Sequence, residues 1–175
     1  MALVRLASRA VIAAFDAVAL VDQVIPELER LTIRPKDVSV LTKAEALRAA
    51  PPPPPSRGLL ARLGKRANWR SDLREIKRPE ADLLAGTGSL AQALADSPST
   101  SPVGALVMQG IPQRDALIYA DLLTQGQTLL LVGVADRTLG ERVRTLLVRH
   151  GGEYVAYYAG RPYGTAFHGS GPGLK

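Results

Sequence analysis

A glycine-rich segment is the first place where residue types and spacing match a known chemical motif. Gly86-Thr87-Gly88-Ser89-Leu90-Ala91 has the spacing of the loop that lets a backbone approach the pyrophosphate of a dinucleotide. That motif also needs a buried strand before the loop and an acidic residue about 20 positions later. Residues 80–85 do not have the pattern of a buried strand, and no acidic residue follows at that distance in the same unit. We therefore expect no bound cofactor here.

The histidines and the absence of cysteine argue against catalytic and metal chemistry. His150 follows an arginine-rich helical pattern, where a positive group would complement the helix dipole. His168 stands alone in a segment rich in glycine, and two isolated histidines make a poor metal site. The chain contains no Cys, which removes disulfides, thiolate nucleophiles and cysteine metal sites. We expect a non-enzymatic, cytoplasmic protein without catalytic, cofactor-binding or metal-binding residues.

Two aspartates and three tyrosines have both a structural and a functional interpretation. Asp16 and Asp136 hold equivalent positions after an apolar run, so each could cap a helix or the two could form a paired acid site. Helix capping explains both residues without further assumptions. Tyr154, Tyr157 and Tyr158 partly alternate along a strand pattern, which favours edge-strand packing or a dimer contact over base stacking.

The basic charge of the chain is concentrated in one segment. The formal net charge is +6, and residues 57–78 alone hold eight basic residues against two acidic ones. The remainder of the chain is therefore neutral. The same segment contains the only Trp and several leucines, so it is the best candidate for binding a partner. The side chains expected to do so are Arg57, Leu59, Leu63, Arg66, Trp69, Arg70, Leu73, Arg74, Ile76 and Lys77.

Nucleic acid phosphates, an anionic membrane surface and a protein surface are all possible partners of this basic segment. A solvated linker without a partner is the plainest alternative. We favour a protein partner, because leucine and tryptophan anchors are not needed for binding phosphates. The aromatic motifs of common RNA-binding domains are also absent from the sequence.

The candidate residues lie in or between two similar strand–helix–strand patterns. The first comprises residues 10–15, 17–31 and 38–41, and the second comprises residues 129–134, 139–150 and 154–158. Such a duplication predicts one domain with a shared sheet. The expected organisation is a first half at 1–43, a proline-rich basic insertion at 44–102, an extra helix and second half at 103–159, and an extended tail at 160–175.

The ends of the domain resemble a known family. Gly110-Ile111-Pro112 followed by Ala116, Tyr119, Leu123 and Gly126 resembles the C-terminal signature of the general stress protein, or heat-induced stress protein, domain family. The turn at Phe15-Asp16 and the stretch 36–40 resemble its N-terminal half. The resemblance implies a ferredoxin-like domain with a role in the stress response and no known reaction. Five prolines and the basic insertion replace the apolar segment usual in that family.

These observations lead to one set of expectations. The fold is α+β, a ferredoxin-like sandwich of two βαβ units with an extra helix at 112–125 and a long irregular insertion. One sheet face is covered by helices, and an open second face would favour a homodimer or a docking partner. The function is that of an accessory or adaptor subunit in a larger protein assembly, with a ligand-sensing regulatory domain and a nucleic-acid-binding protein as alternatives. No segment is long and apolar enough to span a bilayer, although peripheral membrane contact remains possible.

Overall fold

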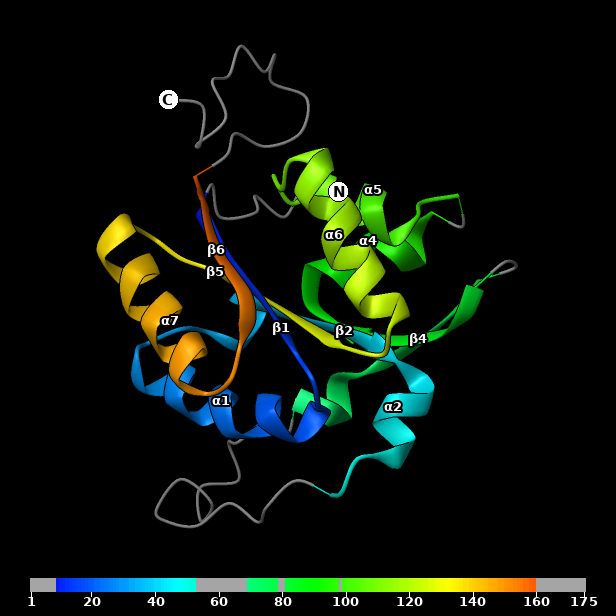
Figure 1. The fold of residues 1–175 in the computed structure, drawn as a ribbon, viewed down its shortest axis with the longest axis horizontal. Helices are drawn as coiled ribbons and strands as arrows, with labels where there is room; N and C mark the ends of the chain where they lie inside the picture. The colour runs from blue at the N-terminus through cyan, green and yellow to red at the C-terminus, as the bar shows by residue number, and fades with distance from the viewer. Residues whose placement is uncertain (1–8, 53–68, 79–80, 98, 160–175) are drawn as a thin grey trace.

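The described part of the chain forms a single six-stranded antiparallel sheet. The computed structural model describes residues 9–52, 69–78, 81–97 and 99–159 (Figure 1). The strands are β1 (Arg9–Phe15), β2 (Val38–Lys43), β3 (Arg74–Arg78), β4 (Ala81–Thr87), β5 (Thr128–Gly133) and β6 (Glu153–Ala159). They lie in the order β3-β4-β2-β5-β1-β6, and each neighbouring pair is antiparallel.

Helices pack on both faces of this sheet. The helices are α1 (Val18–Arg30), α2 (Ala44–Ala49), α4 (Gly88–Asp96), α5 (Pro102–Met108), α6 (Gln113–Thr124) and α7 (Arg137–Arg149), with 3-10 turns η1 (Pro35–Asp37) and η2 (Trp69–Asp72). In Figure 1, α1 and α7 lie on one side of the sheet, and α4, α5 and α6 lie on the other. The protein therefore has three layers.

Strand β1 shows how both layers are held. Val11 and Phe15 belong to the buried cluster that includes α1 and α7, whereas Ile12 and Ala14 belong to the cluster that includes α4, α5 and α6. Side chains alternate across a strand, so a continuous apolar run is what a strand buried on both faces requires. The prediction of such a strand at residues 10–15 is confirmed.

The two strand–helix–strand units meet in the middle of the sheet. β1 pairs with β5 from Ala10 to Phe15 and with β6 on its other side, so strands from the two ends of the sequence are direct neighbours. β2 pairs with β5, which places these four strands in the order β2-β5-β1-β6. The expected α+β architecture with a shared sheet is confirmed.

Two expectations about the remainder of the fold are wrong. The second face of the sheet is not open, because Leu90, Leu106 and Leu123 cover it from α4, α5 and α6. Residues 44–102 are not an irregular insertion where they are described, since they contribute β3, β4, α2 and α4, and α5 begins at Pro102. β4 extends the sheet by pairing with β2 along Val40–Lys43. The apolar run of β4 is too short to predict a strand by itself, and the pairing with the distant strand β2 is what makes it one.

None of the helices in the described residues combines the length and the apolar character needed to cross a membrane.

Candidate functional site

A buried aspartate on α1 holds the only tryptophan in place. The Asp22 side chain is 4% exposed, and its Oδ1 accepts hydrogen bonds from Trp69 Nε1 at 2.8 Å and from Arg70 Nε at 3.2 Å. A further hydrogen bond joins Arg70 Nη2 to Asp22 Oδ2, and the guanidinium carbon lies 5.8 Å from the centre of the Trp69 ring. A buried carboxylate needs such partners to offset its lost hydration. The contact therefore fastens η2 to α1.

The residues expected to bind a partner differ in where they lie. Arg57, Leu59, Leu63 and Arg66 lie outside the described residues. Trp69 and Arg70 are half-buried against Asp22, and Leu73 is also half-buried.

The strand that follows η2 has one buried residue and three exposed ones among its first four. Ile76 is 6% exposed and packs in the core, which corrects the expectation that it is a surface anchor. Arg74 and Lys77 are exposed, and Arg74 donates a hydrogen bond to Gln92 at 3.1 Å. Side chains alternate along a strand, so Ile76 points into the core while its direct neighbours Glu75 and Lys77 point to the opposite face.

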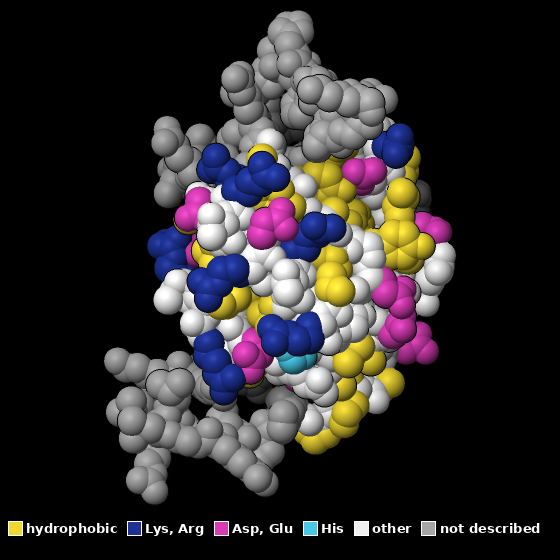
Figure 2. Space-filling model, turned by 60° about the vertical axis from the view of Figure 1, so that its left-hand side comes forward, with side chains coloured by type: hydrophobic (Ala, Val, Ile, Leu, Met, Phe, Trp, Pro, Cys, Tyr) yellow, Lys and Arg dark blue, Asp and Glu magenta, His cyan; other side chains and the backbone are white. Residues whose placement is uncertain are grey.

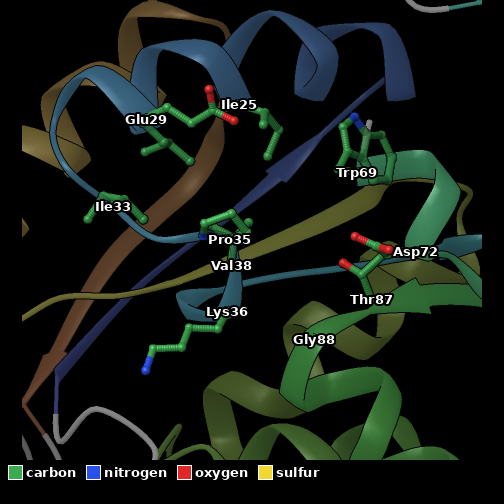
Figure 3. A pocket seen from close by; sticks show the side chains of 11 residues that line it. Ile25, Glu29, Ile33, Pro35, Lys36, Val38, Trp69, Asp72, Thr87 and Gly88 are labelled. Carbon is green, nitrogen blue, oxygen red and sulfur yellow. The ribbon is translucent and has the colours of Figure 1, made fainter. Parts of the chain in front are cut away.

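The tryptophan fastened by Asp22 forms one wall of a cavity of about 260 Å³. The lining residues are Ile25, Leu28, Glu29, Ile33, Pro35, Lys36, Val38, Trp69, Asp72, Thr87 and Gly88. They come from α1, η1, the start of β2, η2 and the turn between β4 and α4 (Figure 3). Segments far apart in the sequence therefore converge on this cavity.

The cavity has an apolar interior and charged side chains at its rim. Leu28 and Ile33 are buried, and Ile25 and Val38 are half-buried. In Figure 3, Asp72 and Thr87 lie together on one side, Glu29 lies across from them on α1, and Lys36 extends away from both. Most small-molecule sites have this composition, with apolar walls and a few polar groups that orient the ligand.

The glycine-rich turn beside the cavity is explained by packing against β2. Contrary to expectation, a strand does precede this turn, because β4 runs from Ala81 to Thr87. Gly88 has φ +70, and an added Cβ would lie 2.5 Å from the Val38 carbonyl oxygen and from Ser39 Oγ. The Ser89 N–H donates to Ser39 Oγ at 2.9 Å. Close packing thus requires glycine here, and the chain's own side chain occupies an N–H that a phosphate would need.

The remaining candidates have structural partners. Asp136 Oδ1 accepts from the Leu139 N–H at 2.8 Å, which confirms the predicted cap of α7. Asp16 does not cap α1, because Ala17 is the N-cap and Asp16 Oδ1 accepts from Gln127 Nε2 at 3.1 Å. His150 lies at the C-cap of α7. Among the described residues no group of three or more His, Asp or Glu side chains is arranged to hold a metal ion.

Buried tyrosines join α6 to β6 on the side of the sheet away from the cavity. The Tyr119 hydroxyl donates to the Tyr154 carbonyl oxygen at 2.5 Å, and the Tyr158 hydroxyl donates to Asp115 Oδ2 at 2.7 Å. Burial raises the pKa of Tyr119 to about 12, and burial also raises the pKa of Tyr158, with its hydrogen bond to Asp115 adding to the effect. These hydroxyls stay protonated at neutral pH and connect two elements.

Sequence patterns missed the cavity for identifiable reasons. Helical spacing places Asp22 on the polar face of α1, so its burial was not expected. Ile33 and Lys36 carry no motif, and Thr87 belongs to a glycine-rich segment whose spacing indicated a dinucleotide instead. These residues meet only when η1, β2 and β4 assemble. The available signals are the lone Trp69 beside basic residues and the glycine-rich turn at Thr87-Gly88.

No protein-family model matches this chain, and no curated protein or solved structure matches it either.

Proposed function

We propose that this protein is a non-enzymatic regulatory domain that binds a small ligand in the cavity beside Trp69. The observation that carries the proposal is the combination of apolar walls at Leu28 and Ile33 with Glu29, Lys36 and Asp72 at the rim. A ligand of matching chemistry has an apolar body and at least one charged group. At about 260 Å³ the cavity suits a molecule near or below the small end of the usual ligand range, about 300–1,000 Å³.

The lining residues favour binding over catalysis. They include no histidine, serine or tyrosine, so the common pairs of nucleophile and base are missing from this wall. The Thr87 hydroxyl accepts from the Val40 N–H at 3.3 Å and so has a structural partner. The acidic groups are on opposite sides of an apolar space, which suits holding a ligand at its ends.

We also propose that the four central strands and two helices form a ferredoxin-like core, as the resemblance to the stress protein family implies. The strand order β2-β5-β1-β6 supports this, as does the position of α1 and α7 on one face. The hairpin of β3 and β4 would then be an extension on the β2 side of that core.

Ligand binding can be tested with the intrinsic fluorescence of Trp69, because the chain has one tryptophan. The probes are a panel of amino acids, short carboxylic acids and aliphatic amines, each titrated against the full chain while fluorescence and thermal unfolding are measured. We expect at least one probe to change the fluorescence saturably and to raise the unfolding temperature.

A matched pair of variants locates the binding. Val38→Phe fills the cavity and should abolish both responses, whereas Leu117→Phe, at a position 54% exposed on α6, should leave them unchanged. A panel without any saturable response contradicts the proposal. Equal binding by Val38→Phe would also contradict it.

A second candidate is an accessory subunit that docks on a larger protein assembly through its basic segment. The exposed side chains of Arg74 and Lys77 on β3 favour it, together with the basic residues at 57–66. The double charge reversal Arg74→Glu with Lys77→Glu should then prevent co-purification of the partner from native cells. If the association also weakens steeply with salt and nuclease treatment removes it, the partner is nucleic acid.

A further inference from the structure

The two edges of the sheet carry different side chains. β3, at one edge, has the sequence Arg74-Glu75-Ile76-Lys77-Arg78, and charged residues of this kind discourage pairing with another strand. β6, at the other edge, has no Lys, Arg or Pro and a single charge at its first residue, Glu153. Within the described residues only β1 pairs with β6. In the part of the chain that the structure describes, the β6 edge therefore lacks the usual protection.

The regular part of β6 is complementary to itself. Residues 156–159 of β6 pair regularly with residues 9–12 of β1, and the register shifts between Ile12 and Ala14. Glu153 lies on the far side of this shift, so the five residues 155–159 carry no charge. An antiparallel pair centred on Tyr157 would place Tyr158 opposite Ala156 and Val155 opposite Ala159 of a second copy. Tyr158 and Val155 then each face an alanine on the same sheet face, the two Tyr157 rings face each other across the axis, and no like charges meet.

The helix above this edge is also complementary to itself. An added Cβ on Gly140 of α7 would lie 2.5 Å from the Tyr157 ring, so α7 rests directly on β6. Beside Gly140, helical spacing places an outer stripe of four residues, Arg137, Glu141, Arg144 and Val148. Glu141 and Arg144 lie 3.6 Å apart with side chains 49% and 51% exposed. In Figure 2, basic and acidic side chains mingle on this side of the molecule, with hydrophobic side chains next to them.

Strand pairing would bring two copies of this helix into contact. α7 packs over both β1 and β6, and strands are spaced about 4.8 Å apart, so two α7 helices would lie about 10 Å apart. A two-fold axis makes these helices antiparallel. When the pair is centred between Arg142 and Val143, Glu141 of each copy faces Arg144 of the other.

We propose that the protein forms a two-fold symmetric homodimer by antiparallel pairing of β6 with β6 and of α7 with α7. The two sheets become one continuous twelve-stranded sheet. The charged β3 strands lie at its outer ends, and the cavities beside Trp69 stay outside the interface.

A first experiment tests the strand contact by measuring the mass of the full chain in solution. Wild type should have twice the monomer mass at micromolar concentration. Ala159→Lys, at an exposed edge position, should weaken dimerisation at least tenfold by placing a charge against the second strand. The control, Lys77→Glu on β3, should dimerise as wild type does. A monomeric wild type, or a dimer unaffected by Ala159→Lys, would overturn the proposal.

A second experiment tests the helix contact by asking whether two charge-reversal variants restore each other's dimerisation, a result that a loss of folding stability would not give. Glu141→Arg alone makes two arginines face each other across the interface, and Arg144→Glu alone makes two glutamates do so, so each variant should dimerise less than wild type. An equimolar mixture should form a heterodimer. When the two variants pair with each other, both contacts between residue 141 of one copy and residue 144 of the other join an arginine to a glutamate, whereas each variant paired with itself has two like-charge contacts. Circular dichroism should show both variants folded. If the mixture stays monomeric, or if either variant alone dimerises like wild type, the proposed pairing is wrong.

Discussion

The β3 and β6 edges of one sheet are held to the body in different ways. On the β3 side, the turn that leads into the strand is fastened by a buried ion pair between Asp22 and Arg70, with a cavity beside it. On the β6 side, the strand is fastened by tyrosine hydroxyls and by close contact of Tyr157 with Gly140. The ion pair on the β3 side borders an open cavity that could hold a ligand. The close packing of Tyr157 on Gly140 instead fixes β6 as an uncharged edge strand, which suits pairing with another strand.

Removal of the carboxylate at the β3 side should have the largest effect. Asp22→Ala removes the buried carboxylate that binds both the Arg70 guanidinium and the Trp69 N–H, and loss of one member of a buried pair costs about 3–5 kcal/mol. Urea unfolding should report this loss, with a red shift of Trp69 fluorescence in the folded state. The control is Asp37→Ala, which breaks an ion pair with an Arg34 side chain that is 63% exposed and should cost under about 1 kcal/mol. Equal costs would show that the anchor is unimportant.

Adding a methyl group to Gly140, on the β6 side, should have the next largest effect on stability. Gly140→Ala forces the Tyr157 ring to move, and overpacking of this kind costs about 1–3 kcal/mol. The matched control is Gly104→Ala in α5, where the nearest atoms lie at 3.5 Å. That change should stabilise the protein by about 0.5–1 kcal/mol, because alanine favours a helix. Thermal unfolding of both variants gives the sign, and the same sign for both would contradict the packing argument.

The smallest predicted effect is a pH dependence at the β6 side. The pKa of Tyr119 is raised to about 12 in the folded protein, above its unfolded value of 10.0. Its contribution is therefore fully present below about pH 10 and is lost as the pH rises toward about 12. Tyr119→Phe should lower stability at neutral pH by about 1 kcal/mol and reduce the alkaline loss, measured by urea unfolding across this range. An unchanged alkaline loss would show that Tyr119 is not responsible.

Asp16 and Asp136, which hold equivalent positions in the two strand–helix–strand patterns, show which local features a sequence can predict. Asp136 caps its helix because the N–H that it binds belongs to Leu139, three residues away. Asp16 binds Gln127 instead, 111 residues away, and no local pattern contains that contact. Gly126 similarly has φ +95 after α6, as its place at the end of a helical pattern predicts.

The amino-acid sequence by itself determined the central strands, the helices α1, α6 and α7, and the sharing of one sheet by both ends of the chain. Periodicity and capping are local, so they are visible without neighbours. Tertiary structure alone decided that β3, β4 and α4 join the sheet and core, that Asp22 is buried under Trp69, and that a cavity forms beside it. These features depend on contacts between distant residues, and in isolation each segment is too short or too polar to indicate its partner.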